Sequence, residues 1–196
     1  MRAIQPSSID VIASTLGPAV PELGQFSSPD GALTLLFTDI ENAASLGERL
    51  GEERWATLVR DHATMVERLI GHHDGTIVKS SADGHMAAFS SAHAGLHSAI
   101  EIQRTFRGPD LRVRTGLHTG FVIVNGTDYL GRNVVLAARI ADRARGGEIL
   151  VSEQLKEYVE TDPSFSFSLH GEYHFKGMLG EHVVYGVDWA DAGAAD

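Results

Sequence analysis

Hydrophobic and polar residues follow two different periods along the chain, and these periods predict strands and helices in turn. Residues 33–37 form a short continuous apolar run, which is typical of a buried strand, and this strand ends at Asp39. The next segment, residues 43–72, carries apolar residues at helical spacing with a break at Gly51. We therefore expect a strand followed by a long, interrupted helix.

Turn residues divide the middle of the chain. Residues 76–79 and 85–89 are extended runs, and the Asp-Gly pair between them predicts a hairpin with Asp83 at or beside its turn. A serine at position 90 or 91 can cap a helix that runs to about residue 106. This part of the chain therefore predicts a hairpin and then a helix.

The rest of the chain alternates in the same way. Residues 111–124 predict two strands, with the glycines at 116 and 120 in tight turns between them. The later elements are expected in this order: a helix at 134–145, a strand at 148–151, a short helix at 152–159, and a hairpin at 165–187 that is broken near 177–180.

The order of these elements predicts the fold class α+β: a ferredoxin-like sandwich in which helices pack on one face of a mostly antiparallel sheet. We expect one domain at residues 32–189, followed by a flexible tail at 190–196. Residues 1–31 hold four of the six prolines, and they predict an N-terminal arm with a short helix near 9–16 and a linker.

Composition and charge narrow the possible functions. The 196-residue chain can bury one good core, and without cysteine any bound metal must use carboxylate, imidazole, carbonyl or water ligands. Its net charge of −10 disfavours nonspecific binding to nucleic acid. No apolar run is long enough to span a bilayer, and the N-terminus lacks the pattern of a signal peptide. We expect a cytoplasmic location and no membrane segment.

Two acidic residues, Asp39 and Asp83, interrupt apolar or small-residue contexts at predicted strand ends. Taken alone, each is most simply a turn or cap residue. Together they could hold Mg²⁺ or Mn²⁺, because carboxylates from adjacent strands bind such ions in two-metal phosphoryl-transfer sites. The pair therefore marks a candidate site for chemistry at phosphorus.

Six blocks of sequence then follow one another in order: LLFTDIE at 35–41, VKSSADG at 78–84, GLHTG at 116–120, DYLG at 128–131, AARI at 137–140 and GEILVS at 147–152. In type and spacing they resemble the catalytic domain of class III adenylyl and guanylyl cyclases. The resemblance covers about residues 33 to 187. It implies that family's fold and a head-to-tail homodimer whose catalytic sites each take residues from both chains.

The resemblance also implies a metal centre and a reaction. Asp39 and Asp83 match the two metal-binding aspartates of the family, and the backbone carbonyl of Ile40 matches a further ligand. Two divalent ions, Mg²⁺ or Mn²⁺, would lower the pKa of the ribose 3′-hydroxyl and hold the triphosphate. The expected reaction converts ATP to 3′,5′-cyclic AMP and pyrophosphate.

Lys79 and Asp128 match the positions that select the base. A lysine only donates hydrogen bonds and so suits N1 of adenine, whereas an ionised aspartate only accepts and suits the N6 amino group. Guanine reverses both demands, so this pair would leave buried groups mismatched. Without the resemblance, Lys79 would be an exposed strand residue and Asp128 a turn residue.

Two more basic residues match the family. Arg139 matches an arginine that stabilises charge on the α-phosphate in the transition state, a role that suits a permanently charged planar group. Outside that comparison it would be a solvated helix residue. Lys176, in a Lys-Gly pair of the last hairpin, matches a lysine that contacts the terminal phosphates.

One position departs from the family. Four residues before the arginine the family has an asparagine that orients the ribose, and this chain has Val135. Asn133 lies close in sequence, but six residues before Arg139 it would point about 240° around the helix. Losing one orienting contact would cost about 10² to 10³ in rate. The alternative hypothesis is therefore a weakly active or inactive homologue that binds nucleotide or dimerises.

Other patterns favour no different function. The Gly-Gly-Asp/Glu-Glu-Phe signature of diguanylate cyclases is absent, and so is a Walker phosphate loop. His72 and His73 suggest a metal, but neighbours on a helix point about 100° apart and do not easily face one ion. We therefore expect these two histidines to be surface or packing residues.

Overall fold

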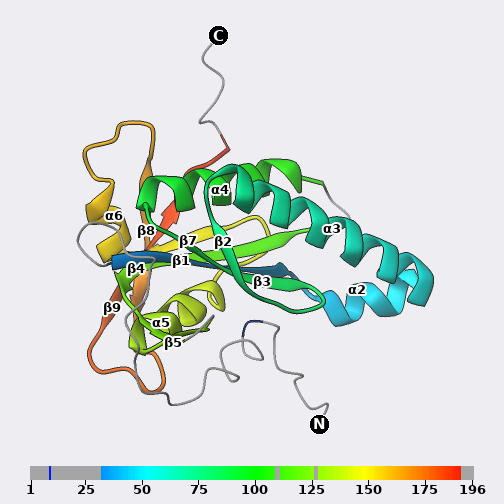
Figure 1. Ribbon diagram of the computed structural model, residues 1–196, viewed down its shortest axis with the longest axis horizontal. Helices are drawn as coiled ribbons and strands as arrows, with labels where there is room; N and C mark the ends of the chain where they lie inside the picture. The colour runs from blue at the N-terminus through cyan, green and yellow to red at the C-terminus, as the bar shows by residue number, and fades with distance from the viewer. Residues whose placement is uncertain (1–8, 10–31, 109–110, 126–127, 191–196) are drawn as a thin grey trace.

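The computed structural model describes Ile9 and residues 32–108, 111–125 and 128–190 (Figure 1). Of the predicted arm at 1–31, with its helix near 9–16, only Ile9 lies within these residues, and it is buried. Of the predicted tail at 190–196, only the first residue does.

A seven-stranded sheet forms the centre of the domain. Its order is β2-β3-β1-β4-β7-β9-β8, and every neighbouring pair is antiparallel except β4 and β7, which are parallel. The strands are β1 (Ala32–Ile40), β2 (Thr76–Ser80), β3 (Gly84–Phe89), β4 (Val113–Phe121), β7 (Ile149–Ser152), β8 (Phe167–Tyr173) and β9 (His182–Val187). Two further strands, β5 (Ile123–Asn125) and β6 (Asp128–Leu130), pair as a separate hairpin.

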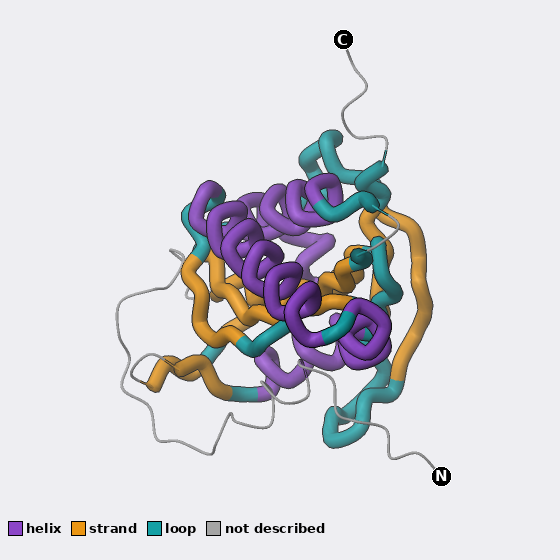
Figure 2. Tube along the Cα trace, turned by 90° about the vertical axis from the view of Figure 1, so that its right-hand side faces the viewer, coloured by secondary structure: helices purple, strands orange, loops and turns teal. Residues whose placement is uncertain are grey.

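Helices cover both faces of this sheet (Figures 1 and 2). We call the side covered by α3 (Glu52–His72), α4 (Ala92–Thr105) and α6 (Glu153–Tyr158) the α4 face. The opposite side, covered by α5 (Arg132–Ala141) and the β5–β6 hairpin, is the α5 face. The predicted α+β class with a mostly antiparallel sheet is confirmed, but the expectation of helices on one face only was wrong.

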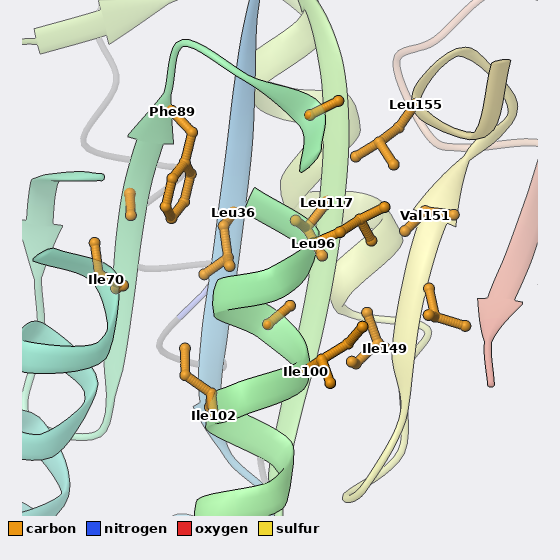
Figure 3. Close-up of a cluster of buried hydrophobic side chains, with 14 of the residues drawn as sticks. Leu36, Ile70, Phe89, Leu96, Ile100, Ile102, Leu117, Ile149, Val151 and Leu155 are labelled. Atoms are coloured by element: carbon orange, nitrogen blue, oxygen red, sulfur yellow. The ribbon is translucent and has the colours of Figure 1, made fainter. Parts of the chain in front are cut away.

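The α4 face holds the largest hydrophobic core. Leu96 and Ile102 of α4 are fully buried together with Leu36 of β1, Phe89 of β3 and Leu117 of β4 (Figure 3). Ser91 caps α4 as expected, because its hydroxyl accepts a hydrogen bond from the Ala94 amide at 3.4 Å. This layer fixes the sheet on which the candidate site is built.

A close contact with the sheet explains how α5 occupies the other face. A side chain at Gly116 would place its Cβ 2.3 Å from the backbone nitrogen of Ala141, so only glycine allows this approach. Gly116 and Gly120 lie inside the single strand β4, and the prediction of two strands with tight turns there was wrong. These glycines serve close packing rather than a turn.

Several predicted boundaries are confirmed and one moves. Gly51, at a φ of 79°, separates α2 (Ala43–Leu50) from α3, and the last hairpin opens into a loop between β8 and β9. The helix expected at 134–145 begins at Arg132 and ends at Ala141 instead. Its end tightens because Ala144 donates to the Ala141 carbonyl at 3.1 Å, an i→i+3 bond.

Candidate active site

Asp39 lies at the end of β1 and faces α5. Side chains alternate along a strand, and Leu33, Leu35 and Phe37 all pack in the cluster beneath α5, so Asp39 shares their face. Its side chain is only 2% exposed. A carboxylate this deeply buried needs a compensating charge.

Asp83 lies beside it, as the sequence predicted. Asp39 pairs with Gly84 across β1 and β3, and the Ile40 amide donates a 3.0 Å hydrogen bond to the Asp83 carbonyl. Burial raises the pKa of Asp39, and the neighbouring charge of Asp83 raises it further. The structure therefore brings Asp39, Ile40 and Asp83 together at one end of the sheet.

Arg114, which the sequence analysis did not identify, supplies the compensating charge. It stands directly opposite Asp39 on β4, and its Nε and Nη2 donate to the two carboxylate oxygens at 2.7 and 2.6 Å. This two-point ion pair opposes the burial that raises the pKa of Asp39. In the sequence, the only sign of this role is that Arg114 is a charged residue inside a predicted strand. Its partner, Asp39, is identified only by the register of β4 against β1.

A β-bulge places Lys79 on the same face. Ile77 pairs with Ala87, whereas Lys79 pairs with Met86, so one extra residue is inserted in β2 between these pairs. Residues paired across antiparallel strands share a face, and Met86 packs in the cluster beneath α5. The bulge therefore aligns Lys79 with the face that carries Asp39.

Arg139 lies in the last turn of α5, near the end of the sheet that carries Asp39. Its Nη1 is 3.5 Å from Asp142, the residue that caps α5. The charge of Asp142 also acts on Asp39 and on Arg114. The end of α5 thus adds one guanidinium and one carboxylate to the surroundings of the acidic pair.

Asp128 and Lys176 belong to connections that leave the opposite end of the sheet. Asp128 begins β6, in the hairpin that follows the end of β4. Lys176 is exposed in the loop between β8 and β9, where neighbouring Phe175 packs against α5. In Figure 1 this loop lies to the left, whereas β1 ends to the right. Within a single chain, the connections that carry Asp128 and Lys176 therefore leave the sheet at the end opposite to Asp39 and Asp83.

The two candidate ribose positions have different surroundings. Asn133 donates from its side-chain amide to the Phe121 carbonyl at 2.6 Å, so it holds α5 against the end of β4. Val135, half-buried on α5, has no polar atom in its side chain. The side-chain nitrogen of Asn133 is thus already hydrogen-bonded within the fold.

The acidic pair fits hard divalent cations. Asp39 and Asp83 offer carboxylate oxygens, which Mg²⁺ and Mn²⁺ prefer, and Ile40 adds a backbone carbonyl at the same strand end. Arg114 already shows that this position attracts positive charge. A cation bound to Asp39 would take over part of the role that the guanidinium has in the structure.

The fold is an α+β domain with an acidic pair at one end of its sheet, and a family model matches this domain. Residues 27–188 match the family described as the adenylate and guanylate cyclase catalytic domain. The chain therefore belongs to this family. The resemblance noted from the six sequence blocks is confirmed.

Known relatives are similar over most of the domain. An uncharacterised protein of Mycobacterium tuberculosis is 33% identical over 126 residues, which are 63% of this chain and 44% of that protein. The chain thus spans less than half the length of that curated relative.

None of the helices in the described residues is both long and apolar enough to cross a membrane.

Solved structures with both kinds of cyclase activity share the fold. An adenylate cyclase of Trypanosoma brucei, solved in its monomeric state, has a TM-score of 0.76 at 25% identity, covering 84% of this chain and 91% of that one. A guanylate cyclase domain from Catenaria anguillulae in complex with GTP has a TM-score of 0.68 at 18% identity, covering 80% and 96%. Membership of the family therefore does not determine whether the base is adenine or guanine, which depends on the residues of this chain.

Proposed function

We propose that this domain is an adenylate cyclase that converts ATP to 3′,5′-cyclic AMP and pyrophosphate. The observation that carries the proposal is the placement of Asp39 and Asp83 side by side at the ends of β1 and β3. Two divalent ions, Mg²⁺ or Mn²⁺, held there would lower the pKa of the ribose 3′-hydroxyl and neutralise phosphate charge. The remaining site residues bind and orient the nucleotide.

The proposed roles of the basic residues follow from their chemistry. Arg139 stabilises negative charge that develops on the α-phosphate, because its guanidinium stays charged and donates in a plane. Lys176 contacts the terminal phosphates as a point charge. A cation held by Asp39 would compete with Arg114 for the carboxylate, and the guanidinium would then be a second positive group at the acidic end of the sheet.

The topology supports a site shared between two copies of the chain. The carboxylates lie at one end of β1, and the connections that carry Asp128 and Lys176 leave the other end. Nine residues of β1 separate the two ends by roughly 30 Å, which one nucleotide does not span. A head-to-tail homodimer would bring the acidic end of one chain to the basic loop of the other.

Mixing two inactive variants tests this arrangement. Asp39→Ala removes a metal ligand, and Lys176→Ala removes a phosphate contact from the opposite end of the sheet. If each site takes Asp39 from one chain and Lys176 from the other, a mixed dimer keeps one intact site. An equal mixture should then recover about a quarter of wild-type activity. A mixture as inactive as its components would show that each site lies within one chain.

The choice of adenine rests on Lys79 and Asp128. The bulge in β2 that places Lys79 on the α5 face supports a specific role for this lysine. Lys79→Glu exchanges a donor for an acceptor and should reduce the ratio of ATP to GTP turnover. Lys79→Met, which keeps the length without the charge, is the matched control. An unchanged ratio in Lys79→Glu would remove the argument for adenine.

Val135 favours a second candidate function, a weakly active or inactive homologue that binds nucleotide. The direct test incubates the purified protein with ATP or GTP and either metal, and measures cyclic nucleotide. Asp83→Ala is the sharper control, because Asp39→Ala would also remove the ion-pair partner of partly buried Arg114. Product no higher than in this control, with both metals, would favour the binding module.

Restoring the family residue separates a slow enzyme from an inactive one. Val135→Asn should raise the rate, by up to about 10² to 10³ if the amide orients the ribose. Cyclic AMP formation per folded molecule is the measurement. A rate that does not change would show that this site does not use position 135 as its relatives do.

A further inference from the structure

Two histidines and a glutamate converge where the end of α3 meets the middle of α4. His73 Nε2 lies 2.7 Å from Glu101 Oε2, and His72 Nδ1 lies 3.5 Å from the same oxygen. One ligand atom from each residue lies within 4.8 Å of the others. The three side chains stand in the helical layer on the α4 face, whereas Asp39 faces α5.

The end of α3 explains how neighbouring histidines can meet. Two adjacent helical residues diverge by about 100°, which was the reason to discount this pair. His72 is the last residue of α3, however, and His73 is its C-cap, with φ −102° and ψ 28°. The chain leaves the helix at this point, and the ring centroids lie only 5.1 Å apart. The 100° divergence of neighbours inside a helix therefore does not apply to this pair.

We propose that His72, His73 and Glu101 form a binding site for a divalent transition metal of the Zn²⁺ class, separate from the cyclase site. Two imidazoles and a carboxylate are the ligands that Zn²⁺ accepts, with water in the fourth position. Tetrahedral Zn²⁺ with bonds near 2.0–2.1 Å needs its ligand atoms about 3.4 Å apart. The observed separations of 2.7 and 3.5 Å lie on either side of this value.

The three side chains differ in freedom, and this suits metal capture. His73 and Glu101 are partly covered, with side chains 22% and 38% exposed, and they already touch. His72 is 71% exposed and can turn to complete the set. Two ligands are therefore held in place while the third adjusts, so that little ordering remains for the metal to impose.

A second ring supports His73 from behind. His97 stacks on His73 with centroids 6.2 Å apart and planes tilted by 16°. It lies four residues before Glu101 on α4, so both project from the same side of that helix. The stack restrains the orientation of the His73 ring. A metal at this site would tie the end of α3 to α4 and thereby stabilise the folded domain.

Equilibrium dialysis of the intact chain against Zn²⁺ tests the site. Millimolar Mg²⁺ in the buffer occupies oxygen-ligand sites such as the acidic pair, because Mg²⁺ prefers oxygen to imidazole. We expect one tightly bound Zn²⁺ per chain under these conditions. His72→Asn/His73→Asn should weaken this binding at least about 100-fold, which is the upper end of the cost of losing even an outer-shell partner.

His93→Asn is the matched control. It removes another histidine of α4, 45% exposed and 3.4 Å from Asp162, without touching the three ligands. Its Zn²⁺ stoichiometry and affinity should equal those of the wild type. The melting temperature in EDTA shows whether each variant folds, and Zn²⁺ should raise it in the wild type and in His93→Asn only. No bound Zn²⁺ in the wild type, or equal binding in the double variant, would overturn the proposal.

Discussion

The two faces of the sheet differ in what they bury. On the α4 face, leucines, isoleucines and phenylalanines from four strands and three helices form one continuous core. On the α5 face, two smaller clusters surround polar groups, among them the ion pair between Asp39 and Arg114. The α4 face has the composition of a structural core, whereas the α5 face carries predicted site residues such as Asp39.

The buried polar groups are organised differently as well. On the α4 face, Gln103 donates to the Val113 carbonyl at 2.9 Å and joins strand to helix. On the α5 face, Arg114 donates two hydrogen bonds, at 2.7 and 2.6 Å, to the carboxylate of Asp39, for which we propose a role in metal binding. A cation bound to Asp39 would have to displace or share the Arg114 pair, whereas it would leave the Gln103 bond unchanged. Substitutions on the two faces should therefore separate stability from activity.

Arg114→Met should have the largest effect. It leaves the buried carboxylate of Asp39 without its partner, and breaking a buried ion pair costs about 3–5 kcal/mol. Urea unfolding measures the loss. Mn²⁺ should restore more stability in this variant than in the wild type, because no guanidinium competes for Asp39. A loss below about 1 kcal/mol would mean that the ion pair does not stabilise the α5 face.

The same variant makes a pH-dependent prediction. Burial raises the pKa of Asp39, and Arg114 opposes the rise, so removing Arg114 raises this pKa further. A carboxyl group with a raised native pKa binds its proton more readily in the folded state than in the unfolded state. The stability lost in Arg114→Met should therefore shrink as pH falls through that raised pKa. A loss that does not change with pH would contradict the assignment.

Leu96→Ala tests the other side of the comparison. Leu96 is fully buried in the core of the α4 face, so its truncation should cost about 2–5 kcal/mol. Cyclase activity per folded molecule should stay at the wild-type level, because the side chain does not reach the α5 face. Urea unfolding and an assay at saturating metal are the two measurements. A fall in activity per folded molecule would show that the faces are coupled.

The sequence predicted the α4 face better than the α5 face, for a physical reason. The apolar spacing of residues 43–72 and the cap at Ser91 act within single elements, so local pattern determines them. Gly116 illustrates the opposite case. Its need for glycine comes from Ala141, which is 25 residues away in sequence and adjacent only in the fold. Local rules assigned it to a turn.

The residues of the candidate site also differ in whether local sequence or distant contacts determine them. Asp39 and Asp83 were predicted from strand ends and from the resemblance, and the structure places them together. Arg114 was missed because its significance depends on the register of β4 against β1. The closeness of His72 and His73 was not expected, because it depends on His73 lying one residue beyond the helix end. Pairing register and helix ends are the quantities that sequence periodicity determines least well.

Gly116→Ala should sharpen the comparison on the α5 face. The added methyl would meet the backbone of Ala141 at 2.3 Å, so α5 must move, at a cost of about 3 kcal/mol. Because α5 carries Arg139, we expect cyclase activity per folded molecule to fall in addition to the loss of stability. Gly71→Ala is the control, since nothing lies within 4 Å of its Cβ, and it should stabilise by about 0.4–1 kcal/mol. If Gly116→Ala keeps its activity per folded molecule, catalysis does not depend on the position of α5.

His62→Leu gives the smallest effect at neutral pH. His62 on α3 and His118 on β4 are both buried, and burial lowers the pKa of each to about 4. Their partners differ: His118 Nδ1 bonds Ser152 at 2.8 Å, whereas neither ring nitrogen of His62 has a hydrogen-bond partner among the described residues. Replacing His62 therefore removes a titrating group without breaking a hydrogen bond.

The sign of the effect follows from proton binding. A histidine whose native pKa lies below its unfolded value binds fewer protons when folded, so its contribution to stability falls as pH drops below about 6.5. The stability of His62→Leu relative to the wild type should therefore rise by about 2 kcal/mol between pH 7 and pH 5. His118→Leu removes a similar titration but also the bond between the ring and the Ser152 hydroxyl, which in the described part of the chain keeps only the Leu155 amide as a donor, so it should cost stability at pH 7. Urea unfolding at both pH values measures the two variants, and equal behaviour would mean that the bond between His118 and Ser152 does not contribute to stability.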